Sequence, residues 1–172
     1  SCGFTTMNLA LFQCVTFLLI MVVAFIGTSP GSTGSGIKVT SLALLVATIK
    51  SIMTGRSVVE IRERKIPHEQ VFKALAIFTL AIAWILITTA LLLITEANPS
   101  CSFLPYVFEA ISAFANLGIS LGLTPLLSSA GKIIIMVSMI IGRIGALTLI
   151  LAIKAHKETG DFQYPEERVM LS

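Results

Sequence analysis

Charge is the property that this sequence has least of. Asp, Glu, Lys and Arg make up 12% of its 172 residues, whereas an average soluble domain has about 25%. No charged residue occurs from position 1 to 37 or from 74 to 95, and the mean hydropathy is +0.94. Apolar stretches of this length match the roughly 20 residues that a helix needs to cross a bilayer. The composition therefore excludes an ordinary soluble domain and predicts a membrane protein.

The sequence also lacks the residue patterns of catalysis and metal binding. Its three cysteines, Cys2, Cys14 and Cys101, are an odd number without the spacing of a zinc site, and we interpret them as small core residues. No Ser/His/Asp set is present, and the glycine-rich run at 31–38 has Ile37 where a phosphate-binding loop needs Lys. We therefore expect no enzyme activity and no bound cofactor.

The few basic residues are unevenly distributed along the chain. Between Thr95 and Lys132 there is no Lys or Arg, and Glu96 and Glu109 are the only charged residues. Cytoplasmic connections of membrane proteins carry an excess of Lys and Arg. The positions of the basic residues therefore predict that the connection 50–73 and the C-terminal tail are cytoplasmic, and that 96–131 faces outside. The basic residues of these two regions are Lys50, Arg56, Arg62, Arg64, Lys65, Lys73, Lys154, Lys157 and Arg168.

A run rich in Gly, Ser and Thr at 27–40 separates two apolar segments, 9–26 and 39–53. Non-helical backbone at membrane depth is stable only where protein covers it or water fills a cavity, because unpaired backbone groups are costly in hydrocarbon. Two topologies fit the pattern: two separate spans joined by a hairpin, or two halves of one long interrupted helix. At membrane depth, the run predicts a pore or a binding site.

A second irregular segment follows a short apolar helix. The apolar stretch 103–114 is too short to cross a bilayer, and an uncharged, glycine-containing stretch at 115–125 precedes the apolar span 133–153. This order is typical of a re-entrant pore helix and filter, and it equally fits an outside loop with an interfacial helix. Arg143 falls in the middle of the last span, where a charge indicates either a pore or gate function or a bond between helices.

Three segments together resemble a known family: 29–38, 112–125 and 141–145. Their sequences, in this order, are similar to the membrane subunit of the bacterial Trk/Ktr potassium-transporter superfamily. The Ktr branch, which includes the subunit called sodium-ATPase subunit J, is the nearest match, and the tail at 164–168 resembles it too. The resemblance extends over essentially the whole chain.

The resemblance implies an all-α polytopic membrane protein with helix–pore helix–filter–helix repeats and one long interrupted transmembrane helix. The chain corresponds to the C-terminal half of the subunit. Residues 1–70 would contain the third-repeat filter, the interrupted second helix with its gate loop, and the cytoplasmic connector. Residues 71–172 would form the fourth repeat, with its helix, pore helix, filter and last helix, and the cytoplasmic tail.

The resemblance also implies which residues contact the ion. Filters of this kind coordinate potassium through backbone carbonyls, which here belong to Ser1, Cys2, Gly3, Asn116, Leu117 and Gly118. The family usually has Thr-Ala-Gly and Thr-Val-Gly at these two places, so the selectivity is open. We expect Arg143 to bond the gate loop and hold it closed. The loop residues of this gate are Gly31, Ser32, Thr33, Gly34, Ser35 and Gly36.

The partners implied are those of a multi-pass protein of the plasma membrane. They are the lipid bilayer, a second copy in a homodimer, a missing N-terminal half with the other two filters, and a cytosolic nucleotide-binding ring. The ring would dock on 55–70 and 154–172. Potassium is the implied transported ion, sodium stimulates transport in such systems, and no nucleic acid is expected. The alternative is a non-transporting truncated remnant or split half, which an in-frame reading of the DNA upstream of Ser1 would distinguish.

Overall fold

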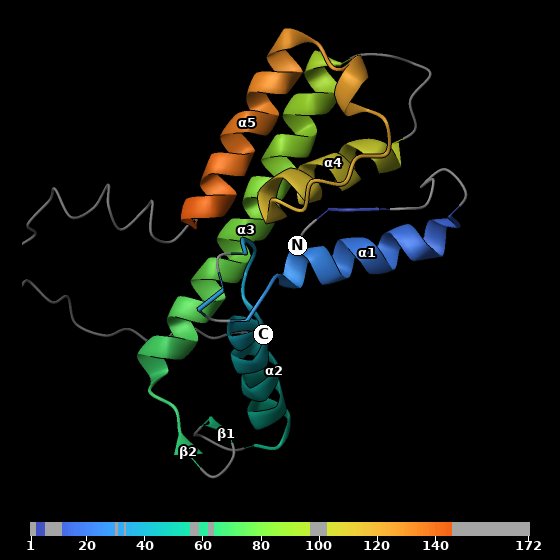
Figure 1. Ribbon diagram of the computed structural model, residues 1–172. Helices are drawn as coiled ribbons and strands as arrows, with labels where there is room; N and C mark the ends of the chain where they lie inside the picture. Colours follow the sequence, from blue (N-terminus) through green and yellow to red (C-terminus); the bar gives the residue numbers. More distant parts are fainter. Residues whose placement is uncertain are drawn as a thin grey trace, which may run out of the picture.

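The computed structural model describes residues 3–5, 12–29, 31–32, 34–55, 59–61, 64–96 and 103–145, and these are mostly helical (Figure 1). A two-residue antiparallel strand pair lies in the connection before the longest helix, and a 3₁₀ turn precedes the last one. The elements in chain order are α1 (Cys14–Ile26), α2 (Val39–Met53), β1 (Glu60–Ile61), β2 (Arg64–Lys65), α3 (His68–Thr95), α4 (Phe103–Ala115), the 3₁₀ turn (Thr124–Leu126) and α5 (Ser129–Ile144).

Helix α3 is the axis around which the other helices pack. In Figure 1, α2 lies beside its lower half, α5 lies beside its upper half, and α4 and α1 lie crosswise to it. With 28 residues, α3 is about 42 Å long at 1.5 Å per residue. It is the one helix of the described residues that is long and apolar enough to cross a membrane. The shorter apolar helices cover Val15–Ile26, Val39–Met53 and Phe103–Ala115.

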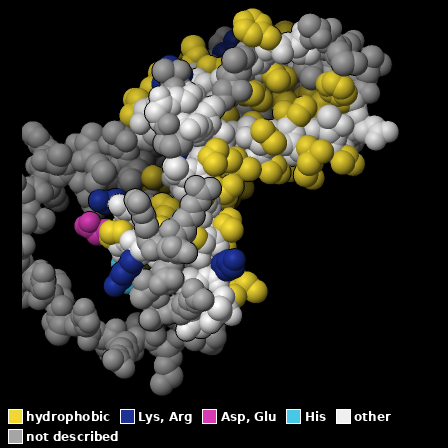
Figure 2. All heavy atoms as spheres, turned by 60° about the horizontal axis from the view of Figure 1, so that its bottom comes forward, with side chains coloured by type: hydrophobic (Ala, Val, Ile, Leu, Met, Phe, Trp, Pro, Cys, Tyr) yellow, Lys and Arg dark blue, Asp and Glu magenta, His cyan; other side chains and the backbone are white. Residues whose placement is uncertain are grey.

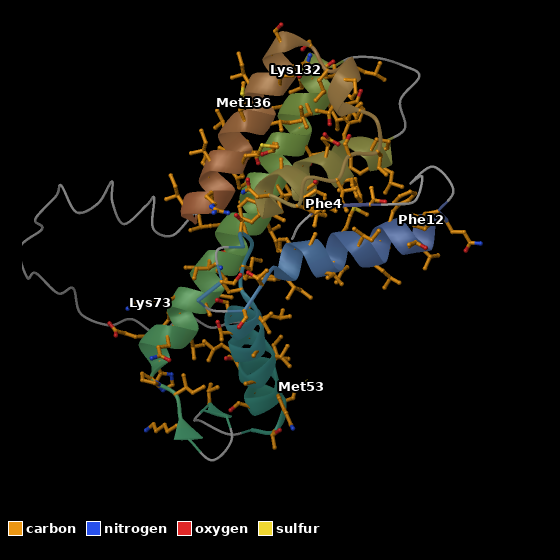
Figure 3. The ribbon with its side chains drawn as sticks, in the orientation of Figure 1. Phe4, Phe12, Met53, Lys73, Lys132 and Met136 are labelled. Atoms are coloured by element: carbon orange, nitrogen blue, oxygen red, sulfur yellow. The ribbon has the colours of Figure 1, made fainter. Side chains whose placement is uncertain are left out.

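Large hydrophobic side chains are exposed along several helices. Val23 of α1 is 67% exposed, Leu86 of α3 is 64% exposed, and Ile140 of α5 is 59% exposed. Figure 2 shows hydrophobic side chains over a broad part of one face, with few charged side chains among them. Lys73 on α3 and Lys132 on α5 lie at opposite ends of the bundle (Figure 3). Apolar flanks with charges near the ends are what a bilayer favours.

Two clusters of buried side chains hold the helices together. One joins the C-terminal half of α3 to α4, α5 and the loop before α5, and it is centred on Leu92 and Tyr106. The other joins α3 and α4 to the irregular segment after α1, through Ala81, Phe114 and Ile37. Because Ile37 is 2% exposed, one end of that irregular segment is fixed in the core.

The helices agree with the sequence in most places. The break expected after residue 26 is present, and α2 begins at Val39, where the apolar pattern resumes. Helix α4 extends one residue beyond the apolar stretch 103–114, and α3 begins directly after Pro67, three residues before the expected start of the fourth repeat at 71. The strand pair was not predicted. The expected start of the first helix at residue 9 lies outside the described residues.

The extent of α5 differs most from the expected span of 133–153. It begins four residues earlier because Ser128 caps it, with the hydroxyl accepting from the Gly131 N–H at 3.2 Å. It ends at Ile144, and Gly145 follows with a φ of 86°. Residues 146–153, on which the longer prediction depended, lie outside the described residues. Arg143 is therefore in the last turn of α5 and not at its middle.

Candidate functional site

The segment directly after α4 has a backbone that helices and strands do not adopt. Asn116 has a φ of 50° and Gly118 a φ of 83°, both in the left-handed region that glycine and asparagine tolerate best. The N–H of Leu117 donates to the Ser112 carbonyl at 2.9 Å, which closes the end of the helix. These contacts end α4, and the backbone carbonyls after residue 115 therefore do not continue its helical hydrogen bonds.

Gly3 lies against this segment. A Cβ built on Gly3 would overlap the Leu117 carbonyl oxygen and would lie 3.0 Å from the carbonyl carbon of Gly118. A Cβ on Gly118 would in turn lie 4.0 Å from the Gly3 Cα. The structure thus brings together Gly3 and 116–118, four of the six residues expected in the filter. Ser1 and Cys2 lie outside the described residues.

The gate loop, which we define as residues 27–38, folds back on itself between α1 and α2. The Ile37 N–H donates to the Phe25 carbonyl at 3.5 Å, and the Val39 N–H donates to the Thr28 carbonyl at 3.1 Å. Ser35 is 5% exposed. Thr33 lies outside the described residues. The loop therefore has a buried C-terminal part and an exposed tip at 31–32.

Lys38 holds the tip of the gate loop, and the sequence analysis did not single it out. Its Nζ donates to the Ser32 carbonyl at 2.9 Å and to the Gly34 carbonyl at 2.5 Å. Lys38 also has a positive φ of 75°, which is uncommon for a residue with a side chain. Its position as the single charge in an uncharged run was the signal that could have identified it.

Asn116 joins the segment after α4 to the gate loop. Its Nδ2 donates to the Ser35 Oγ at 3.0 Å and to the Met139 carbonyl of α5 at 3.0 Å. Nearby, Gly142 of α5 lies so close to the end of α4 that a Cβ there would overlap the Phe114 carbonyl oxygen. The expected filter and the expected gate are therefore in direct contact.

Arg143 and the gate loop line one cavity of about 510 Å³. The loop contributes Ser32 and residues 34–38. The other lining residues come from the first turn of α2, from Ile77 of α3 and from the C-terminal end of α5. The Arg143 side chain is exposed, and among the described residues its guanidinium makes no hydrogen bond with the loop. The expected bond between Arg143 and the loop is thus not present in this part of the chain. Among the described residues that line the cavity, Lys38 and Arg143 are cationic and none is acidic.

Two buried carboxylates hold the region between α3 and α5, and the sequence analysis treated them only as outside charges. Glu96 is 7% exposed and accepts from the Ser128 N–H at 2.8 Å and from the Ser128 hydroxyl at 2.5 Å. Glu109 is 5% exposed and accepts from the Thr124 hydroxyl, which also bonds the Ser120 hydroxyl at 2.8 Å. Both acids therefore anchor the chain that follows α4.

The described residues contain no group of three or more His, Cys, Asp or Glu side chains that could hold a metal ion.

Comparison with known proteins gives one consistent result. The family model TrkH, described as a cation transport protein, matches residues 1–163. Ktr system potassium uptake protein D of Bacillus subtilis (strain 168) is 36% identical over 169 residues, which are 98% of this chain and 37% of that protein. Potassium/sodium uptake protein NtpJ of Enterococcus hirae is 35% identical over 157 residues, which are 90% of this chain and 35% of that protein.

The fold is similar to a solved transporter. The crystal structure of the potassium transporter TrkH from Vibrio parahaemolyticus matches with a TM-score of 0.71 and 23% sequence identity, over 87% of this chain and 33% of that chain. The likeness shows the fold. The chain spans about a third of the length of the relatives that it matches.

Proposed function

The chain belongs to the TrkH family of cation transport proteins, and from this membership we propose that it forms part of a pore for potassium uptake across the cell membrane. One observation carries the proposal. Gly3 packs against Leu117 and Gly118 although these residues lie far apart in the sequence. Two glycine-containing segments that approach this closely can present backbone carbonyls to one ion, as a carbonyl-lined filter requires.

The proposed filter consists of the carbonyls of Ser1, Cys2 and Gly3 from one repeat and of Asn116, Leu117 and Gly118 from the next. The left-handed backbone at Asn116 and Gly118 supports this assignment, because it takes the chain out of the helical hydrogen-bonding pattern. Helix α4 would be the pore helix that carries the second segment. A complete pore would need further repeats, and we propose that the remaining part of a full-length transporter supplies them.

The proposed gate is the loop 27–38. It is irregular backbone between two apolar helices, it lines a cavity, and its Ser35 contacts the proposed filter residue Asn116. Lys38 holds the loop tip through two carbonyls, and we assign the closing contact to Lys38. Arg143 would contribute its charge to the same cavity, where repulsion from Lys38 and Arg143 would disfavour binding of a transported cation.

We place the protein in the plasma membrane as a multi-pass chain, with α3 as one span and the exposed apolar flanks toward lipid or neighbouring repeats. The basic connection between α2 and α3 would then face the cytoplasm. We further propose a homodimer and a cytosolic nucleotide-binding ring that docks on 55–70 and 154–172. The names of two relatives, as Ktr system proteins, support a system with several components.

A substitution at Gly118 tests the proposed function. Gly118→Ser is expected to reduce potassium uptake, or its preference over sodium, on the order of tenfold, because a side chain at left-handed φ costs roughly 1–2 kcal/mol at the ion-contacting backbone. The measurement is initial uptake by a host without its own potassium uptake systems, expressing the complete gene product.

Gly122→Ser is the matched control. Gly122 has nearly the same φ, 86°, a Cβ added to it would have no atom within 4 Å, and it lies outside the proposed filter. It should leave the uptake and the ion preference unchanged. Equal effects of the two substitutions, or none at Gly118, would remove Gly118 from the filter.

A further inference from the structure

We propose that Asn116 couples ion selection to gating, because its side-chain amide ties the proposed filter to Ser35 of the gate loop. The inference rests on the proposed function, and it adds a role for one residue that the function by itself does not require. A displacement of the gate loop would, through this amide, change the backbone that begins the filter.

The amide has no spare donor. A side-chain amide nitrogen has two protons, and Asn116 uses its Nδ2 for both the Ser35 hydroxyl and the Met139 carbonyl, each at 3.0 Å. Three elements that are distant in the sequence therefore meet at one nitrogen. These are the segment after α4, the gate loop and α5.

The backbone of the same residue is held in an uncommon conformation. Asn116 has a φ of 50°, which asparagine tolerates better than other residues with a side chain but which is still uncommon, so its surroundings contribute to holding it there. The side-chain bonds to Ser35 and Met139 are part of those surroundings. Loss of the Ser35 contact would therefore affect the conformation from which Leu117 and Gly118 continue.

Ser35 has little room to move without affecting its neighbours. It is 5% exposed, and its carbonyl oxygen would lie only 2.6 Å from a Cβ on Gly27. On the other side of the contact, Gly142 packs against the Phe114 carbonyl. Densely packed regions transmit a displacement and do not absorb it. Movement of the loop at Ser35 should thus reach Asn116.

The first test asks whether a gate-loop substitution changes a filter property. Ser35→Ala should lower the ratio of potassium to sodium uptake by about 2- to 10-fold, the range that corresponds to the net contribution of one hydrogen bond. Thr79→Ala is the control, because it also removes one hydroxyl group. The exposed Thr79 hydroxyl donates to the Leu75 and Ala76 carbonyls of its own helix, at 3.0 and 3.1 Å, and lies outside the proposed gate and filter, so this variant should leave the ratio unchanged.

The second test is a double-mutant cycle between Ser35→Ala and Asn116→Gly in the complete gene product. Glycine keeps the left-handed backbone accessible and removes the amide. The combined effect on the uptake ratio should be smaller than the product of the single effects, because both changes remove one shared contact. Uptake rates are normalised to the amount of protein in the membrane.

Additive effects, or single variants that leave the ratio unchanged, would overturn the coupling while potassium uptake by the unaltered protein still supported the proposed function. If Asn116→Gly does not accumulate in the membrane, the comparison of Ser35→Ala with Thr79→Ala tests the coupling by itself. A ratio that is equal in these two variants would likewise overturn it. Absence of uptake by the unaltered protein, relative to the host alone, would instead contradict the proposed function.

Discussion

The two irregular segments of this chain are held by groups of opposite charge. The carboxylate region, which we define as the loop 116–128 with Glu96 and Glu109, is fixed by two buried acids and the hydroxyl groups that bond them. The gate loop is held at its tip by one amine, that of Lys38, which bonds two carbonyls. The first region is bonded to two buried acids, whereas the bonds at the tip of the second join a half-buried amine to the carbonyls of Ser32 and Gly34.

This difference indicates which segment can move. Segments with few buried contacts and exposed hydrogen bonds open at a small part of the global unfolding free energy. The gate-loop tip fits that description, since Ser32 is exposed. In the carboxylate region the hydroxyls of Ser120 and Ser128 also accept backbone N–H groups. From these contacts we expect the tip of the gate loop to open more readily than the loop 116–128.

The largest expected effect on stability is at the contact between α4 and α5. Gly142→Ala should lower the free energy of unfolding by about 1–3 kcal/mol, because the added Cβ overlaps the Phe114 carbonyl and the helices must separate. Thermal unfolding in detergent measures it. Gly131→Ala is the control: its Cβ would meet the Glu96 carboxylate, a side chain that can shift at the loss of its bonds to Ser128, whereas the Phe114 carbonyl is backbone, so the cost of Gly131→Ala should be smaller. A larger cost at Gly131 would contradict the rigid contact between α4 and α5.

The next effect concerns the carboxylate region. Glu109→Ala should lower the unfolding free energy by roughly 1–3 kcal/mol, because the Thr124 hydroxyl loses its buried acceptor. Glu109→Gln keeps an acceptor oxygen and should cost less. The two unfolding midpoints in the same detergent give the comparison. Equal losses would mean that the charge, and not the hydrogen bond, stabilises this region.

A substitution in the gate loop should change the potassium flux and not the stability of the protein. Lys38→Met removes the amine that bonds the loop tip, so we expect potassium flux to rise several-fold while the unfolding free energy changes by less than about 1 kcal/mol. Flux and thermal unfolding are measured on the same variant. Lys132→Met, at the opposite end of α5 from the loop, should change neither. Reduced flux in a stable Lys38→Met protein would contradict the assignment of the closing contact to Lys38.

The smallest effect is expected at Arg143. Because the guanidinium has no hydrogen bond to the described part of the loop, we expect it to affect ions in the cavity only through its charge, and such effects weaken in salt. Arg143→Ala should raise flux by up to about twofold at low ionic strength, and Arg143→Lys should restore it. An effect as large as that of Lys38→Met, and unchanged by salt, would show that Arg143 holds the loop directly.

Much of the fold could be predicted because it depends on local pattern. The apolar stretch 39–53 forms a helix with these bounds, and the helix after Pro67 begins where proline permits one. Hydropathy did not predict where α5 ends. The apolar stretch continues to residue 153, whereas the described helix ends before Gly145, whose φ of 86° a helix does not accommodate. Composition alone gives no sign of that conformation.

The sequence motifs predicted which residues belong to the candidate site, but they did not predict the contacts between those residues. Gly3, Asn116 and Gly118 were expected in one filter because of their motifs, and their approach to one another depends on how α1, α3 and α4 pack. Neither the Asn116–Ser35 bond nor the Lys38 contact with the loop carbonyls could be read from spacing. A flexible side chain can bond many different partners, and only the folded chain determines which of them lie within reach.

The sequence by itself determined that this is an apolar, mostly helical chain with two irregular segments, because hydropathy and glycine content act over a few neighbouring residues. The tertiary structure decided how those segments meet. It placed Asn116 against Ser35, and it buried Glu96 and Glu109, which the sequence indicated only as charges on the outer side of the membrane. The physical reason is that hydrogen bonds and burial depend on distances between residues far apart in the sequence, and folding sets those distances.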